Sequence, residues 1–493
     1  MTSSELLKTF DFITNNRLSK VNVSKTASND YQIHLLPNFS ASQLKLIVDL
    51  SSSDKEAIKK LNSPLYSFQS GKVKYFLVDV ETLVKNLETE YLIDPPYSRV
   101  SDLVGQISTR IKPDQGLSLQ FYGKAQDACV PAFVGILLAQ YSFKGALKKA
   151  TEGNIEVVGL TPKFLKAALE KARAFAGATN IARHLVNLPP NWLHPVSYSK
   201  LIEGLFKNSK SVQVEVWDEK RLKKENMNLH LAVGKVGETA PRLVKIGIGP
   251  KTAKKRYAVI GKGITFDSGG LDLKPSQAMR LMKKDMGGSA AVVGQAYALS
   301  LLKPKCRVEC YLALAENGVS EGAFRPGDII QARNGLTVEI HNTDAEGRLV
   351  MADALTLATE GSKKPDAVFD AATLTGAIKV GLGAEVGGLF SNKKSLQNQF
   401  LKAAEDVGEL FWPMPLVGKE RHRLNSPVAD LVNSTDGFGG AITAALFLEN
   451  FINKTPWVHL DIYAWNDRAS GALNESGGSG QAARALAQFF INQ

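Results

Sequence analysis

Cysteine is scarce in this sequence: only three occur in 493 residues. Cys306 and Cys310 lie four positions apart in a strand-like stretch, where an extended chain separates their Cα atoms by about 13 Å, too far for a disulfide. The composition therefore argues against a disulfide-dependent fold and fits a reducing compartment. We expect a cytoplasmic protein.

Long hydrophobic runs are also absent. No apolar run reaches the roughly 20 residues that a membrane span needs, and the candidate at 130–143 is shorter and contains Gln140. The amino terminus, MTSSELLKTFDF, lacks the basic-then-apolar pattern of a signal peptide. We expect no membrane association. With 44% hydrophobic and 22% charged residues, the sequence predicts a globular protein with a large core.

Several catalytic signatures are missing. The seven histidines are scattered and form no HExxH motif, which argues against a mononuclear zinc peptidase. No Gly-Lys pair is followed by the Ser or Thr of a phosphate-binding loop, which argues against an NTPase. No GxSxG motif marks a serine nucleophile. The chemistry must therefore be sought in other residue types.

Negative charge is in deficit, because the formal net charge is +12 and basic runs occur at 220–224 and 251–256. A basic balance suits polyanions. No aromatic interleaving, zinc-finger spacing or RNA-binding motif supports that use. We expect a solvated basic surface without nucleic acid, and a basic DNA-binding scaffold remains the non-catalytic alternative.

The most informative segment is Asn-Thr-Asp-Ala-Glu-Gly-Arg at 342–348. Asp344, Glu346 and Arg348 alternate with small residues, so an extended backbone would point all three side chains to one face. Such a pocket suits a hard divalent cation, and its arginine suits a small anion. Apolar residues at helical spacing follow, which predicts that a loop feeds a helix here. The simpler alternative is a surface turn closed by an Asp–Arg ion pair.

A second segment begins as a buried strand at 257–266 and carries Lys262 and Asp267. Their odd spacing would place them on opposite faces of a regular strand. Gly261 and Gly263 flank the lysine and permit a β-bulge that could bring both side chains to one side.

Four carboxylates from the two segments balance the charge of two divalent cations, which is the arrangement of two-metal hydrolases. These carboxylates are Asp267, Asp285, Asp344 and Glu346.

These motifs resemble the leucyl aminopeptidase family, the cytosolic aminopeptidases with two metal ions. The matching stretches are GKGITFDSGG at 261–270, Lys274, KDMGG at 284–288 and NTDAEGRL at 342–349. Shorter matches occur at 182–191, 325–328, 370–377 and 426–433. The resemblance covers roughly residues 170–493 and is faint before them.

The resemblance implies an α/β protein with two domains. A small N-terminal α/β domain would occupy residues 1–160. A larger catalytic α/β/α domain with a mainly parallel central sheet would occupy 161–493 and open with a connector helix at 161–187. The sequence agrees, because strand-like segments alternate with helical ones after 210.

The resemblance also implies the ligands of two metal ions, manganese or zinc. Lys262, Asp267, Asp285 and Glu346 would hold one, and Asp267, Asp344 and Glu346 the other. Lysine can be a ligand only when it is neutral, and burial beside a dication favours that form.

By the same resemblance, a metal-bridging water would attack the first peptide bond of peptides with a free N-terminal amine. Lys274 would stabilise the oxyanion, and Arg348 would hold a bicarbonate that transfers protons. The family's substrate-contacting positions correspond to Met282, Asn342, Thr373, Leu374, Gly376 and Tyr463. Tyr463 stands where relatives have a small residue, which predicts a narrower or more polar side-chain pocket. A homohexamer is expected, and a narrower dipeptidase, such as a cysteinylglycine hydrolase, remains the enzymatic alternative.

Overall fold

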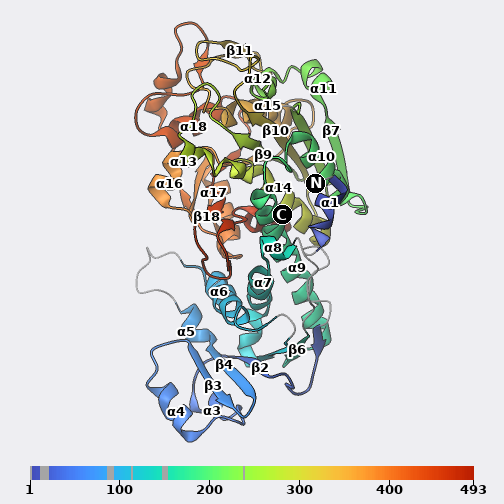
Figure 1. Ribbon diagram of the computed structural model, residues 1–493, viewed down its shortest axis with the longest axis vertical. Helices are drawn as coiled ribbons and strands as arrows, with labels where there is room; N and C mark the ends of the chain where they lie inside the picture. The colour runs from blue at the N-terminus through green and yellow to red at the C-terminus, as the bar shows by residue number, and fades with distance from the viewer. Residues whose placement is uncertain (1–2, 12–20, 86–93, 113–114, 147–153, 237–238) are drawn as a thin grey trace.

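The computed structural model describes residues 3–11, 21–85, 94–112, 115–146, 154–236 and 239–493 (Figure 1). Its strands form two main sheets, one of six strands and one of eight. The six-stranded sheet lies at one end of the elongated molecule, and the long helix α9 runs from near it into the other part (Figure 1).

The six-stranded sheet has the order β1-β6-β5-β2-β4-β3, and only its β3–β4 pair is antiparallel. Its strands are β1 (Val21–Val23), β2 (Tyr31–Leu36), β3 (Leu65–Ser70), β4 (Val73–Asp79), β5 (Leu117–Phe121) and β6 (Ile155–Val158). The helices of this part are α3 (Ala41–Leu44), α4 (Ser52–Lys59), α5 (Val80–Val84), α6 (Pro96–Ser108), α7 (Cys129–Ala139) and α8 (Phe143–Ala146). It contains none of the predicted site residues.

The apolar stretch around residue 135 forms α7, a short helix that is buried almost throughout. Among the described residues, no helix is long and apolar enough to cross a membrane. All three cysteines are free, and their spacing in the sequence had excluded only a disulfide between Cys306 and Cys310.

The proposed boundary at residues 160 and 161 falls between β6 and the predicted connector helix, which the structure shows as α9 (Pro162–Asn187). The first helix, α1 (Ser3–Lys8), packs against α10 (Pro195–Phe206). Thr9 also contacts His184 of α9 through a 2.7 Å hydrogen bond. Residues 3–9 are therefore anchored on the part that follows residue 161.

The eight-stranded sheet has the order β15-β14-β17-β13-β9-β10-β8-β7. Its inner strands β17, β13, β9 and β10 are mutually parallel, and antiparallel pairs flank them on both sides. The strands are β7 (Val212–Trp217), β8 (Arg242–Ile248), β9 (Arg256–Asp267), β10 (Arg307–Asn317), β13 (Ala367–Ala372), β14 (Gly387–Ser391), β15 (Phe411–Pro413) and β17 (Trp457–Asp461). The predicted α/β class with a mainly parallel sheet is confirmed.

Helices cover both faces of this sheet, because its inner strands are apolar on both sides. Helices α9, α14 (Gly287–Leu302) and α19 (Ala483–Ile491) pack together on one face. Helices α12 (Asn228–Gly234), α15 (Gly347–Thr359) and α18 (Gly440–Glu449) cover the other. Other helices are α11 (Glu219–Lys224), α13 (Ser276–Met279), α16 (Gly376–Leu382) and α17 (Lys394–Glu405). Small sheets are formed by β11 (Ile329–Gln331), β12 (Thr337–Glu339) and β16 (Leu431–Val432), and by β18 (Trp465–Asn466) and β19 (Gly477–Gly478).

The carboxyl ends of the parallel strands meet at one edge of the sheet. Asp267 ends β9, Asn317 ends β10 and Asp461 ends β17. Ligands of open α/β sheets bind at this edge, and the predicted site lies there.

Candidate metal centre

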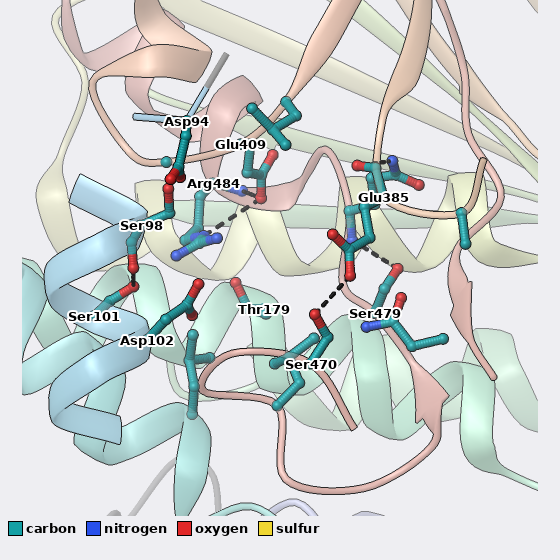
Figure 2. A pocket seen from close by; sticks show the side chains of 17 residues that line it. Asp94, Ser98, Ser101, Asp102, Thr179, Glu385, Glu409, Ser470, Ser479 and Arg484 are labelled. Carbon is teal, nitrogen blue, oxygen red and sulfur yellow. Dashed lines mark hydrogen bonds and ion pairs between the residues drawn. The ribbon is translucent and has the colours of Figure 1, made fainter. Parts of the chain in front are cut away.

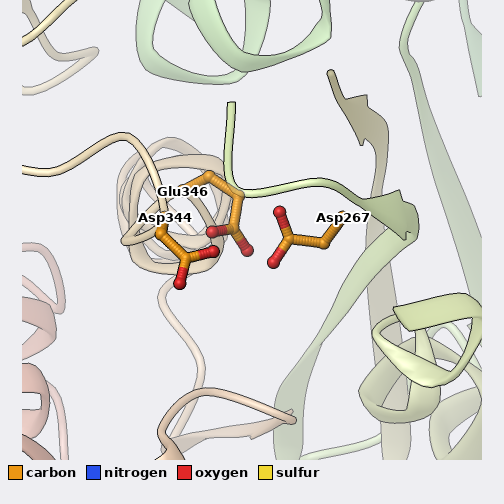
Figure 3. A group of neighbouring side chains, drawn as sticks. All are labelled: Asp267, Asp344 and Glu346. Atoms are coloured by element: carbon orange, nitrogen blue, oxygen red, sulfur yellow. The ribbon is translucent and has the colours of Figure 1, made fainter. Parts of the chain in front are cut away.

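Three carboxylates converge at the end of β9 (Figure 3). Asp267 comes from the strand, and Asp344 and Glu346 come from the loop that leads into α15. One oxygen from each lies within 4.8 Å of the others, and Asp267 and Glu346 are buried. A single cation could contact all three.

The loop reaches this geometry by a turn and not by the extended backbone that the alternation of its residues predicted. Asn342 accepts a hydrogen bond from the Ala345 backbone N–H at 3.2 Å. Its side-chain oxygen accepts another from the Asp344 N–H at 2.7 Å. Asn342 therefore shapes the turn that aims the two carboxylates.

Strand β9 contains the predicted irregularity, but at a different position. Ile264 pairs with Ala315, and the next pair is Asp267 with Asn317, so β9 has one extra residue there. The extra residue reverses the alternation of side chains, which brings Lys262 and Asp267 to the same centre.

The glycines beside Lys262 serve a different purpose from the one predicted. A Cβ atom on Gly261 would lie 2.6 Å from the Cα of Ser289 in α14. A Cβ atom on Gly263 would lie 2.5 Å from Leu314 of β10. These glycines permit close packing of the helix and the neighbouring strand on β9.

Lys262 lies in the middle of the acidic group and is 3% exposed. Its Nζ is 2.7 Å from Asp285 and 2.9 Å from Glu346, and it donates a 3.0 Å hydrogen bond to the Thr373 carbonyl. A Cβ atom on Gly347 would lie 2.4 Å from the Lys262 side chain. A side chain at the glycine of the heptad would therefore displace the end of the Lys262 side chain.

Opposing effects act on the pKa of Lys262. Burial lowers it, whereas Asp285, Glu346 and Asp267 raise it, and the net pKa lies above the usual value. Burial and the neighbouring Asp267 raise the pKa of Glu346 above its usual range. Without a metal ion the site therefore holds an ammonium at Lys262, and a metal must displace that proton before the amine can be a ligand.

Lys274 pairs with the other two carboxylates. Its Nζ lies 2.9 Å from Asp267 and also contacts Asp344. Burial lowers the pKa of Lys274, but the carboxylates, Asp267 first, raise it above the usual value. For the carboxyl group of Asp344 the effect of burial is opposite: burial raises its pKa to about 6, and repulsion from Asp267 adds to this.

The donor set fits divalent cations. Four carboxylates face two lysines, so the centre keeps an excess of negative charge. Among the described residues, Glu346 Oε2 is buried with neither a hydrogen bond nor an ion pair. A buried carboxylate oxygen without a partner is costly, and a hard cation would satisfy it.

Two asparagines that the sequence reasoning missed hold the centre in place. Asn317 donates a 2.8 Å hydrogen bond to Asp267 and a 3.0 Å bond to the Thr343 carbonyl. Asn433 donates to the Asn342 carbonyl at 2.7 Å. Asn317 could have been found as a polar residue that ends the strand beside Asp267. Asn433 is the last residue of the 426–433 match, but the sequence does not show that this residue contacts the 342–348 loop.

Arg348 lies in the first turn of α15 and is 7% exposed. Its Nη1 donates to the Asn433 carbonyl at 2.7 Å, and among the described residues its Nε has no partner. Burial lowers the pKa of Arg348 to about 10. Within the described part of the chain it forms no ion pair with a carboxylate, so the alternative of a simple Asp–Arg turn is not supported.

Among the predicted substrate-contacting residues, Thr373 contacts the centre directly. Met282 belongs to a short 3-10 helix before Asp285, and Gly376 begins α16. Thr373 donates a 2.8 Å hydrogen bond to Asp285, and the Leu374 N–H donates to Asp461 at 3.1 Å.

Tyr463 is half-buried, and its ring contacts two lysines that the sequence reasoning missed. Lys284 is 4.4 Å from its ring centroid, and Lys379 is 4.0 Å from it. Lys379 also donates a 2.7 Å hydrogen bond to the Tyr463 hydroxyl. Burial lowers the pKa of Lys284 to about 8, although Asp285 opposes this. We refer to Lys284, Lys379 and Tyr463 as the cationic wall.

A separate cavity of about 190 Å³ lies between α6, α9 and the loops near the C terminus (Figure 2). Asp102, Thr179, Glu409 and Arg484 are among its lining residues, and Arg484 pairs with Glu409 at 3.4 Å. None of the predicted site residues lines this cavity.

Comparisons with known proteins now bear on the site. Residues 180–487 match the family described as "Cytosol aminopeptidase family, catalytic domain". The chain belongs to the cytosol aminopeptidase family. This enzyme is a metallo-aminopeptidase, a hydrolase that acts on peptides.

Three further likenesses extend over most of the aminopeptidase. It is 38% identical over 408 residues to the probable cytosol aminopeptidase of Persephonella marina, which covers 80% of this chain and 82% of that protein. The bottromycin maturation enzyme BotP, solved in complex with Mn, superimposes with a TM-score of 0.82 at 31% identity and covers 94% of this chain and 99% of that one. A crystal structure of cytosol aminopeptidase from Coxiella burnetii gives a TM-score of 0.79 at 28% identity, over 96% of this chain and 99% of that one.

Proposed function

We propose that this aminopeptidase releases N-terminal amino acids from peptides by means of two divalent metal ions held at the end of β9. The observation that carries the proposal is the convergence of Asp267, Asp344 and Glu346, together with the unsatisfied oxygen of Glu346. Hard cations match oxygen ligands of this kind.

The ligands divide into two overlapping sets. Asp285 and Lys262 lie on one side of Glu346, where Lys262 contacts both carboxylates. Asp344 lies on the other side, within reach of Asp267 and Glu346. Glu346 and Asp267 would therefore be shared by both ions, and Lys262 would lose its proton as the first ion binds. The ions are manganese or zinc in this proposal, in keeping with the manganese complex of BotP.

Two divalent ions at this place would act as Lewis acids that polarise the scissile carbonyl and lower the pKa of an attacking water. Lys274 would then be released from Asp267 and Asp344, because the ions take over the charge that it balances. Its ammonium becomes available to the oxyanion of the tetrahedral intermediate.

Arg348 supports the bicarbonate proposal, because its buried guanidinium has an unused donor among the described residues. A bicarbonate held there supplies a group that can accept and release protons. The arginine itself holds the anion and does not act as a base, since it keeps its proton.

Selectivity for the chain terminus would come from the free amine of the substrate, which binds on the Lys262 side of the centre. The first side chain of the substrate would contact Met282, Thr373, Leu374, Gly376 and Tyr463. The cytoplasmic location, the homohexamer and the domain boundary at 160 remain part of this proposal and follow from the family resemblance.

The test is metal analysis of the purified protein with activity measurements on aminoacyl amides. We expect close to two divalent ions per subunit, loss of activity on chelation, and recovery with manganese or zinc. Full activity in a thoroughly chelated protein would overturn the proposal.

A further inference from the structure

Lys284 is buried next to the centre without an anionic partner. Its side chain is 5% exposed, and within the described part of the chain no carboxylate lies within the 4.0 Å of an ion pair. Its Nζ lies 4.4 Å from the centroid of the Tyr463 ring and has no hydrogen-bond or ion-pair partner among those residues. A buried ammonium without a carboxylate is costly, and an aromatic ring compensates only part of that cost.

The carboxylates near Lys284 are engaged elsewhere. Asp285 pairs with Lys262. Asp461 accepts hydrogen bonds from the Leu374 and Thr375 backbone N–H groups. The cationic wall therefore has an excess of positive charge.

The neighbouring residue Lys283 provides an internal comparison. It also lies over an aromatic ring of the same segment, 5.4 Å from the centroid of Trp465. Its ammonium, however, donates a 2.8 Å hydrogen bond to the Asn187 carbonyl. Two adjacent lysines thus have similar ring contacts, but only Lys283 has an oxygen partner among the described residues.

Lys379 adds a second ammonium at the same ring. Its own carboxylate, Asp467, is 3.6 Å away and largely exposed, so solvent weakens that pair. Both ammoniums therefore lie within 4.4 Å of the Tyr463 ring centroid, and neither has a buried carboxylate partner among the described residues.

We propose that the cationic wall is an anion subsite that selects peptides whose N-terminal residue carries a carboxylate side chain, aspartyl or glutamyl. This inference rests on the proposed function, because it takes Tyr463 to line the pocket for the first side chain. The substrate carboxylate supplies the partner that Lys284 lacks, and charge-assisted hydrogen bonds of this kind are strong in a buried site.

The experiment compares glutamyl and glutaminyl amides, which have nearly the same shape and differ in charge. We expect the kcat/KM of the wild-type holoenzyme to be at least about tenfold higher for the glutamyl substrate. Lys284→Met keeps the length of the side chain and removes its charge, so the ratio should fall to about one. Lys283→Met is the matched control and should keep the wild-type ratio.

Each outcome is decisive. A wild-type ratio at or below one overturns the proposal without any variant, so a folding defect in Lys284→Met cannot obscure the result. An equal fall in Lys283→Met and Lys284→Met overturns the assignment to Lys284. Hydrolysis of leucyl but not glutamyl amides overturns the subsite and leaves the proposed function intact. No hydrolysis of any substrate by a two-metal preparation overturns the proposed function itself.

Discussion

The acidic centre and the cationic wall are adjacent in the chain and opposite in character. Lys284 and Asp285 are neighbours, yet one belongs to the wall and the other to the centre. In the centre, Lys262 and Lys274 each contact two carboxylates, and negative charge remains in excess. In the wall, Lys284 contacts an aromatic ring and, among the described residues, no carboxylate.

This difference indicates two kinds of missing partner. Buried charges are stable only when they are paired. An excess of carboxylates is complemented by cations, and an excess of ammoniums by an anion. In our proposals, the two regions together form a site for metal ions and for a negatively charged group of the substrate.

The largest effect is expected at the acidic centre, from Glu346→Ala. Loss of the shared carboxylate should abolish turnover and leave metal content well below two per subunit. The metal-free protein should remain folded, because Glu346 Oε2 has no partner among the described residues and Lys262 keeps its ion pair with Asp285 when Oε1 is lost. Metal analysis, activity and thermal unfolding measure these effects. Glu405→Ala on the surface of α17 is the control, and near-wild-type activity of Glu346→Ala would end the two-metal proposal.

The next effect separates the two lysines of the centre. Lys274→Ala should weaken transition-state stabilisation by about 3–4 kcal/mol, because the proposed partner of Lys274 is the oxyanion. This loss should appear as a lower kcat with little change in KM. Metal content should be retained, since the change removes a cation that competes for Asp267 and Asp344. Lys305→Ala, an exposed lysine, is the control. A change confined to KM would show that Lys274 only binds substrate.

A smaller effect is expected in the wall. Tyr463→Ala opens volume in the proposed pocket. The kcat/KM of leucyl and phenylalanyl substrates should therefore rise relative to that of alanyl substrates, by a factor that corresponds to about 1–3 kcal/mol. Tyr463→Phe keeps the ring beside both lysines and removes only the hydrogen bond to Lys379. It should leave this ranking nearly unchanged. An unchanged ranking in Tyr463→Ala, with a lower melting temperature, would instead mean a packing role.

The smallest expected effect concerns the basic surface as a whole. A protein with a net charge of +12 could bind a polyanion. The proposed ligand of the cationic wall, in contrast, is a small carboxylate. We expect no salt-sensitive duplex binding at about micromolar protein, where each phosphate contact would add close to one unit of log–log slope. Tight, salt-sensitive binding by Glu346→Ala would favour the scaffold alternative.

Much of the fold was readable from the sequence. Six strands of the large sheet coincide with strand-like segments of the sequence: β7, β8, β9, β10, β13 and β17. Helix α9 begins after its N-cap residue Thr161 and ends before two prolines. Local patterning specifies such elements because side-chain periodicity and capping are properties of nearby residues.

The details of the centre were less accessible. The alternation in the heptad predicted an extended segment, but a turn through Asn342 aims Asp344 and Glu346. The bulge in β9 was expected at its glycines and occurs between Ile264 and Asp267. In both cases the pattern identified the residues that converge and gave the wrong backbone path.

The sequence by itself determined the α/β class, the carboxylates and lysines of the centre, and the family to which the motifs point. Only the tertiary structure decided which charges are paired. Asn433, Lys284 and Lys379 meet partners from other segments of the chain, so no local pattern could reveal those contacts. Pairing depends on distances across the sheet edge, and those distances are set by how helices pack on the strands.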